Sequence, residues 1–282
     1  MIDLIAEWAP SIVVGLDPLS MIALAAIVMI GLPHGAFDGA VAIALGYGNT
    51  LKSMLGFILG YIAIAASVVA FWLIFSDIAL ILFLIISVFH FGIGDCQSGK
   101  WVTRTTQTIA HGGLVVVGIS ILHRSEVELI FIHLVGSETA LLWQFLDMAS
   151  FGLIAILIMY LVQAFLLPSI RIRFFELVGL GLAYYFLPPL VGFALYFCAV
   201  HSVRHLRYTW VKLRLRAYGV RTLVLLACFF TAISWIAGIS IFWQMPNTET
   251  IDGAILRVIF IGLAALTVPH MLLVDGIFRR VS

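Results

Sequence analysis

Charged residues are scarce in this sequence, and their scarcity decides the broad class of the protein. Of its 282 residues only 10% are Asp, Glu, Lys or Arg, while 63% are hydrophobic. A soluble domain has about 25% charged and about 45–50% apolar residues. The chain is therefore expected to be an all-α, polytopic membrane protein. A formal net charge of +1 gives no reason to expect binding to nucleic acid.

Cysteine and N-terminal basic residues are also lacking. The three cysteines, Cys96, Cys198 and Cys228, are far apart and form no CxxC pair, so the sequence gives no indication of a disulfide framework or a cysteine metal site. The first ten residues contain Asp3 and Glu7 but no Lys or Arg. Because a cleavable signal peptide begins with a basic region, the first apolar run is expected to stay in the mature protein.

The apolar runs predict a transmembrane helical bundle of about nine spans, forming a single integral-membrane domain over residues 1–282. A span needs about 20 apolar residues. The runs are 18–46, 54–75, 78–97, 105–122, 140–167, 172–187, 190–209, 221–243 and 254–278. Gly31-Leu32-Pro33 predicts a kink in the first run. If 172–209 is one helix broken at Pro188-Pro189, the count falls to eight.

The basic residues support the nine-span topology, because twelve of the fifteen fall in alternate loops. These twelve are Lys52, Lys100, Arg104, Arg171, Arg173, Arg207, Lys212, Arg214, Arg216, Arg221, Arg279 and Arg280. By the positive-inside rule these loops are cytoplasmic. The N-terminus is then expected outside and the C-terminus inside, in a multi-pass protein of the cytoplasmic (inner) membrane.

Two histidines, His201 and His205, are four residues apart in an apolar run. At this spacing their side chains lie on the same face of a helix, where both can reach one metal ion. Ionisable residues inside a membrane are costly and usually face a bundle interior or a site. A hydrogen-bonded pair without metal is the alternative for this motif taken alone.

Other histidines are predicted to lie at the same depth as this pair. Counted from the outer ends of their spans, His34, His90, His201, His205 and His270 all lie about 11–16 residues in, on four helices that run in the same direction. A shared ligand explains this layer better than five separate pairings. His111, on a span of opposite direction, also reaches the inner half, whereas His123 and His133 fall in an outer loop.

Imidazole ligands without cysteine suit iron, copper or zinc. Asp38, Asp95 and Asp275 follow His34, His90 and His270 by four or five residues, so each could accept the other ring N–H of a metal-binding histidine. Solvation at a helix end is the alternative for Asp95. Arg204 is expected to be paired, and Asp38 is one candidate partner.

The residues around these histidines are aromatic or small. An aromatic-lined tunnel for a long apolar molecule would have this composition, but so would ordinary membrane packing. The candidate lining residues are Phe37, Phe89, Phe91, Tyr196, Phe197 and Tyr208. Gly31, Gly35, Gly39, Gly92 and Gly94 would permit close helix contact or leave room for a substrate.

Four motifs together resemble the bacterial and archaeal Brp/Blh-type β-carotene 15,15′-dioxygenases. They are Gly31-Leu32-Pro33-His34-Gly35-Ala36-Phe37-Asp38, Phe89-His90-Phe91-Gly92, His201-Ser202-Val203-Arg204-His205 and Val268-Pro269-His270-Met271. No single motif is specific, but the set occurs in matching order from about Gly31 to Asp275.

The resemblance implies that O₂ cleaves the central 15,15′ double bond of all-trans-β-carotene into two molecules of all-trans-retinal. It also implies one non-haem Fe(II) held by His34, His90, His201 and His205. His270, His111, Asp38 and Asp95 are further candidates as an extra ligand or as hydrogen-bond partners of ligands. The substrates would be β-carotene and O₂, taken up within membrane lipid, and the product would supply a microbial rhodopsin.

Two other classes of function remain in competition at this point. A di-iron membrane desaturase or hydroxylase acting on a lipid or carotenoid would use more histidines in short clusters. A transporter with a histidine relay would carry inverted repeats and broken helices, of which only the Pro-His pairs at 33–34 and 269–270 are a loose sign. A retinal-binding opsin is excluded because Lys52, Lys100 and Lys212 all lie in loops.

Overall fold

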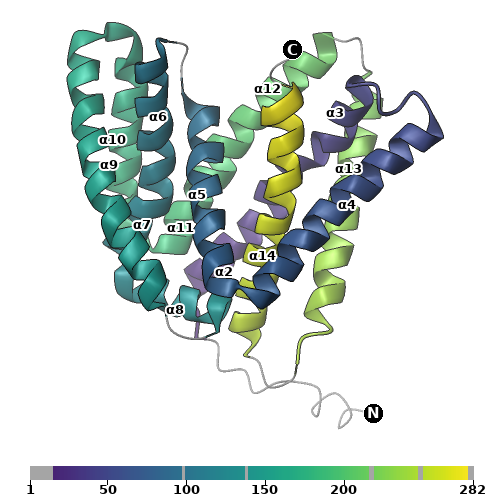
Figure 1. Cartoon of the computed structure of the whole chain (residues 1–282), viewed down its shortest axis with the longest axis horizontal. Coiled ribbons are helices and arrows are strands. Elements are labelled where there is room, and N and C mark those ends of the chain that lie inside the picture. The colour runs from purple at the N-terminus through teal and green to yellow at the C-terminus, as the bar shows by residue number, and fades with distance from the viewer. Residues whose placement is uncertain (1–14, 97–98, 137–138, 216–218, 247–249, 279–282) are drawn as a thin grey trace.

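A computed structural model describes residues 15–96, 99–136, 139–215, 219–246 and 250–278, and within these ranges the chain is helical and contains no strand (Figure 1). Helices other than α-helices are labelled η. The elements are α2 Pro18–Ala26, η1 Ile27–Gly31, η2 Leu32–Phe37, α3 Asp38–Ala44, α4 Leu51–Ile74, α5 Ser76–Asp95, α6 Trp101–Gly113, η3 Leu114–Gly118, α7 Ile119–Leu122, α8 Arg124–Val135, α9 Ala140–Leu166, η4 Pro168–Ile170, α10 Arg171–Phe186, α11 Pro189–Ala194, η5 Leu195–His201, α12 Ser202–Leu215, α13 Val220–Phe242, α14 Ile251–Met271 and η6 Leu272–Phe278.

In the described part of the chain, seven helical runs are long and apolar enough to cross a membrane. They are 18–44, 51–74, 76–95, 101–122, 140–166, 220–242 and 251–278. The other two expected spans are also helical: α10, and the continuous run of α11, η5 and α12 over 189–215. The chain breaks between them at Pro188-Pro189. The prediction of a helical membrane protein is confirmed.

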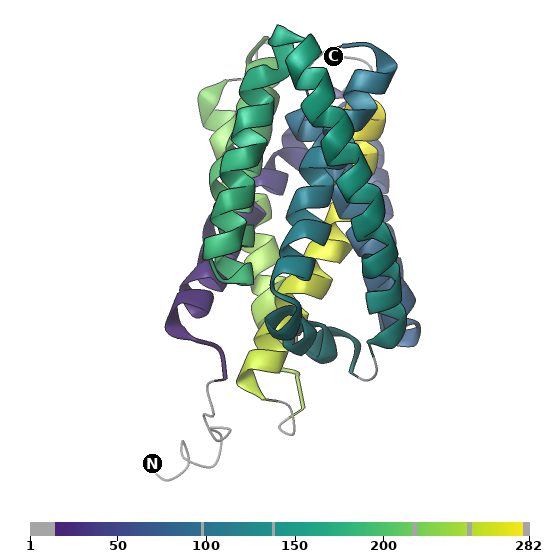
Figure 2. The same ribbon diagram turned by 90° about the vertical axis from the view of Figure 1, so that its left-hand side faces the viewer.

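Consecutive long helices run in opposite directions, as short loops between spans require. α4 descends beside α14, α5 rises, α6 descends, and α9 rises to the loop from which α10 returns (Figure 1). α9 and α10 cover one side of the bundle (Figure 2). α2 begins at one end of the molecule and η6 finishes at the other.

Local sequence signals fix several helix ends. The Asp17 carboxylate accepts the backbone N–H groups of Leu19 and Ser20, with Pro18 at the first helical position of α2. Both features favour a helix start, because they satisfy or remove N–H groups that have no partner within the helix. Thr50 caps α4 and Thr250 caps α14 in the same way.

The structure differs from the expected spans in two places. The predicted kink of the first span is a change of helix type: the chain passes through a π-helix, η1, and a 3₁₀-helix, η2, before α3. The segment expected as an outer loop contains helix α8, which ends at Gly136 with φ of 79°. A helix forms within this connection because Val127, Ile130 and Leu134 give it an apolar face that packs into the core. Residues 1–14, Arg216, Arg279 and Arg280 lie outside the described part.

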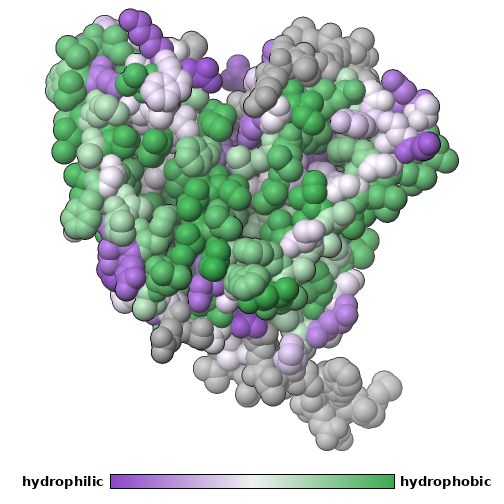
Figure 3. Space-filling model, in the orientation of Figure 1, coloured by the Kyte–Doolittle hydropathy of each residue, from purple (hydrophilic) through white to green (hydrophobic). Residues whose placement is uncertain are grey.

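Two helices are partly or fully exposed along nearly their whole length. Within α4 only Trp72 is buried, and within α13 only Leu223. Hydrophobic side chains also cover the flanks of the molecule in Figure 3, with hydrophilic residues mostly near its two ends. Such an apolar belt suits contact with lipid.

Helices α5 and α6 cross so closely that glycine is required on each. A Cβ on Gly92 would collide with the Thr108 backbone, and a Cβ on Gly112 would collide with that of Val88. This contact sets the position of His90, two residues before Gly92. The close approach predicted for small residues beside the histidines is therefore present here.

Gly92→Ala is accordingly expected to lower the free energy of unfolding by about 1–3 kcal/mol, because the backbones must separate. Gly60→Ala is the matched control, since nothing lies within 4 Å of a Cβ at that position on α4. Unfolding of the purified protein in detergent would measure both. Equal stability of the two variants would contradict the close crossing.

Candidate functional site: a cluster of buried histidines

Four imidazole rings meet in the interior of the bundle. His90 comes from α5, His201 from the end of η5, His205 from α12 and His270 from α14, and all four are buried. Ring centroids are 4.8 Å apart for His90–His201, 5.3 Å for His90–His270, 4.8 Å for His205–His270 and 6.3 Å for His201–His205. Each ring therefore contacts the next in a closed cycle, which we call the histidine circuit. Three parts of the chain build it.

Two ring nitrogens in this circuit have the separation of neighbouring ligands on one ion. Nε2 of His90 lies 3.1 Å from Nε2 of His201. Metal–imidazole bonds are about 2.0–2.1 Å long, so two nitrogens on one ion at about 90–110° lie about 3 Å apart. The donor set of neutral imidazoles fits a first-row transition metal.

Carboxylates support two of the rings from outside. Asp38 lies 2.8 Å from Nδ1 of His270, and Asp275 lies 3.3 Å from Nδ1 of His90. The Tyr61 hydroxyl donates to the second oxygen of Asp38, at 2.8 Å. A carboxylate at Nδ1 holds the proton on that nitrogen and leaves Nε2 as the electron-pair donor. Both rings are therefore prepared to bind through Nε2.

The sequence left open which histidine each carboxylate would contact. Asp275 lies beside His90 and Asp38 beside His270, in both cases a histidine of another helix. Tyr61 was not singled out, although a tyrosine hydroxyl inside a span needs a partner and its position there is a usable signal.

Departures from α-helical geometry surround the cluster. The π-helix η5 ends on His201, and the π-helix η6 begins two residues after His270. Pro269 lies inside α14 and supplies no N–H. π-Helical turns are rare and occur often at functional sites. The interruptions coincide with the positions where side chains converge.

His34 lies on η2, and its side chain falls outside the described part of the structure. The backbone beside it lies near the cluster, because a Cβ on the next residue, Gly35, would be 3.9 Å from Nδ1 of His270. Among the described side chains, which exclude that of His34, no three His, Cys, Asp or Glu groups are arranged to hold a metal ion as they stand.

His111 and Asp95 belong to a neighbouring polar network. Asp95 is 1% exposed and accepts hydrogen bonds from Arg204 Nη1 and the Tyr196 hydroxyl, both at 2.6 Å. Arg204 also pairs with Glu176 of α10. His111 Nε2 is 3.5 Å from the Tyr160 hydroxyl, and its Nδ1 is 4.0 Å from Asp95.

The expectation that Arg204 is paired is confirmed, but its partners are Asp95 and Glu176 rather than Asp38. Solvation of Asp95 at a helix end is excluded by its burial. His123 lies at a turn, where Nε2 is 2.6 Å from the Tyr184 carbonyl oxygen.

The predicted lining aromatics separate into two groups. Phe91, Tyr196 and Phe197 surround His201, with ring centroids at 4.9, 6.1 and 6.1 Å. The others have different neighbours: Phe37 packs edge-on against Trp210, Phe89 is 45% exposed, and Tyr208 packs beside Lys212.

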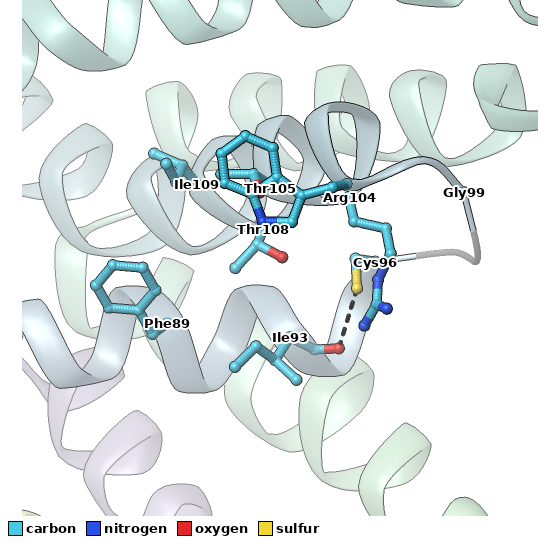
Figure 4. Close-up of a pocket in the computed structure, with 9 residues that line it drawn as sticks. Phe89, Ile93, Cys96, Gly99, Arg104, Thr105, Thr108 and Ile109 are labelled. Atoms are coloured by element: carbon cyan, nitrogen blue, oxygen red, sulfur yellow. Dashed lines mark hydrogen bonds between the residues drawn. The ribbon is translucent and has the colours of Figure 1, made fainter. Parts of the chain in front are cut away.

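Two cavities open near these helices. One, of about 400 Å³, is a groove between α5 and α6 lined by Phe89, Ile93 and Thr108 among others (Figure 4). Phe89 precedes His90 but takes part in this outer groove, whereas His90 faces the cluster. The second, of about 430 Å³, lies between η2, α12 and α13 and includes Phe37.

The fold and the cluster together define an integral-membrane helical protein whose interior gathers imidazoles backed by carboxylates. A family model described as beta-carotene 15,15′-dioxygenase matches residues 25–278. A curated "Beta-carotene 15,15'-dioxygenase" of uncultured marine bacterium 66A03 is 34% identical over 266 residues, which is 94% of this chain and 96% of that protein. No solved structure matches the chain.

The chain belongs to the β-carotene 15,15′-dioxygenase family, and the resemblance stated from its four motifs is confirmed. The prediction that it is a dioxygenase enzyme of this family is confirmed with it. This membership disfavours both competing classes, the di-iron desaturase and the transporter.

Proposed function

We propose that this protein cleaves the central 15,15′ double bond of all-trans-β-carotene with O₂, giving two molecules of all-trans-retinal, at a non-haem Fe(II) held by histidines within the membrane. The observation that carries the proposal is the closed circuit of four buried imidazoles, two of them with Nε2 atoms 3.1 Å apart. Family membership supports the reaction, since the curated relative bears its name.

The proposed ligands are His34, His90, His201 and His205, and His270 joins them as a candidate because its ring contacts those of His90 and His205. Ferrous iron bound there would supply the activation of O₂. Asp275 and Asp38 hold the Nδ1 protons of His90 and His270, so that Nε2 of each faces the circuit. Neutral imidazoles add no charge that the interior must neutralise.

The remaining task of the chain is to position the polyene. Phe91, Tyr196 and Phe197 enclose His201 and exclude water on that side. β-Carotene is a rigid hydrocarbon about as long as the bilayer core is thick, so a site inside the bundle can receive it directly from lipid. Orientation of a bound substrate by packing can supply much of the barrier reduction.

We further propose a single domain over residues 1–282 with nine spans, placed in the cytoplasmic membrane with the N-terminus outside and the C-terminus in the cytoplasm. The alternation of basic loops supports this topology. The substrates are β-carotene and O₂ within membrane lipid, and the retinal product would pass to a microbial rhodopsin.

Expression in β-carotene-producing bacteria tests the reaction. Loss of orange colour and appearance of retinal in extracts is the expected result. Unchanged carotene in cells that contain the folded protein would overturn the proposal.

Asp38→Asn is expected to lower iron affinity about 10–100-fold, because the charged partner of His270 is lost. Tyr61→Phe is the matched control: it removes the hydrogen bond to the other Asp38 oxygen and keeps the charge, so its effect should be smaller. Iron content after dialysis against a graded chelator measures both. If Asp38→Asn retained as much iron as the wild-type protein, His270 would be excluded from the ligand set.

A further inference from the structure

The cavity between η2, α12 and α13 is lined by several residues that are next in sequence to histidines of the proposed site. Its lining includes Pro33, Phe37, Ser202, Leu206, Ala227 and Trp235. Pro33 precedes His34, Ser202 follows His201, and Leu206 follows His205. Ser202 and His205 are three residues apart on α12, so their side chains are neighbours on the helix surface.

This cavity joins the lipid-facing surface to the interior. Ile30, Val203 and Leu206 of its lining are more than one third exposed, whereas Phe37 and Ser202 are at most 6% exposed. Nearly all of the lining is apolar. Its volume of about 430 Å³ is at the lower end of the range for small-molecule sites, about 300–1,000 Å³, which suits half of a C40 chain better than the whole.

One buried hydroxyl in this apolar lining lacks a hydrogen bond. Ser202 Oγ is buried and has no partner among the described residues. Other serines in the helices donate to the carbonyl four residues earlier, at 2.8 Å for Ser67, 2.7 Å for Ser120 and 3.0 Å for Ser234. For Ser202 that carbonyl belongs to Cys198, in the π-helix η5. A buried hydroxyl without a partner is costly, and such a group calls for a ligand or another explanation.

We propose that this cavity holds one C20 half of the polyene and that the Ser202 hydroxyl donates a hydrogen bond to the aldehyde oxygen created at its cut end. The inference rests on the proposed function. The C15–C15′ double bond breaks, each carbon takes one atom of O₂, and two C20 aldehydes form. β-Carotene has no polar atom, so Ser202 gains a partner only once the carbonyl has formed. Ser202 is thus a product-binding residue.

Binding of all-trans-retinal to the purified full-length protein tests this role without turnover. Retinal quenches tryptophan fluorescence, and Trp235 lines the cavity. Ser202→Ala is expected to raise the Kd for retinal about three- to tenfold, the value of one hydrogen bond. It should not change the Kd for a C20 polyene that ends in a methyl group. Ser120→Ala is the control: that serine is equally buried but bonded to Val116.

A second variant tests the cavity itself. Ala227→Phe fills it and is expected to weaken binding of both C20 ligands and to slow cleavage of β-carotene. Ala237→Phe, at an exposed position of α13 outside the lining, should do neither.

Wild-type retinal affinity in Ser202→Ala, or wild-type affinity and cleavage in Ala227→Phe, would overturn the inference. The proposed function fails separately, if the wild-type protein forms no retinal while Ser202→Ala still weakens retinal binding. If the wild-type protein cleaves β-carotene but Ser202→Ala and Ala227→Phe both bind retinal as the wild type does, only the proposed role of the cavity is excluded.

Discussion

Replacing His201 or His205 by alanine is expected to abolish β-carotene cleavage and to remove most of the bound iron. Loss of a group that merely supports a ligand costs about 10–100-fold in metal affinity or activity, so loss of a ligand itself should exceed that range. Both rings lie in the circuit, at 4.8 Å from His90 and His270 respectively. Retinal formation and iron per chain, measured on the same preparation, give the two readouts.

His123→Ala is the control for this pair. His123 is partly buried at the turn between α7 and α8 and contacts a carbonyl oxygen, but it is not part of the circuit. Its removal should leave iron and cleavage unchanged. If His205→Ala kept both at the wild-type level, His205 would not be a ligand. If iron fell equally in His123→Ala, the loss would reflect general damage to the fold.

The sequence allowed the histidine layer to be located because depth in a membrane depends only on residue count and helix direction. His90, His201, His205 and His270 were placed at one depth in this way, and their rings do lie in contact. Metal binding by these rings stays a prediction. The family could be identified because four motifs kept their order and separation.

Which carboxylate serves which histidine could not be read from spacing. Asp275 is five residues after His270, yet it lies beside His90 of α5, and a contact between two helices cannot be read from spacing along one of them. The pairing of Arg204 with Glu176 joins α12 to α10, and a contact between two helices is not encoded in the hydropathy of either one. Helix α8 was missed because its twelve residues are too short to appear as a span.

Arg204 should be the costliest of the charged side chains to remove. In Arg204→Met the fully buried Asp95 carboxylate loses its ion pair, and the free energy of unfolding is expected to fall by about 3–5 kcal/mol. Arg124→Met is the matched control, because its partner Asp147 is half exposed and such pairs contribute at most about 1 kcal/mol. Denaturation of the detergent-solubilised protein measures both.

The double variant Arg204→Met with Asp95→Asn distinguishes loss of the Arg204–Asp95 ion pair from the cost of leaving the Asp95 charge buried without a partner. It should be more stable than Arg204→Met alone, because the carboxylate that was left without its cation is now neutral. Glu176 keeps Arg173 as a partner at 2.8 Å in either background. Since Arg204 lies between His201 and His205, the same substitution is expected to lower bound iron, and the double variant should regain little of it. Stability restored together with full iron content would mean that the buried ion pair does not position the two histidines.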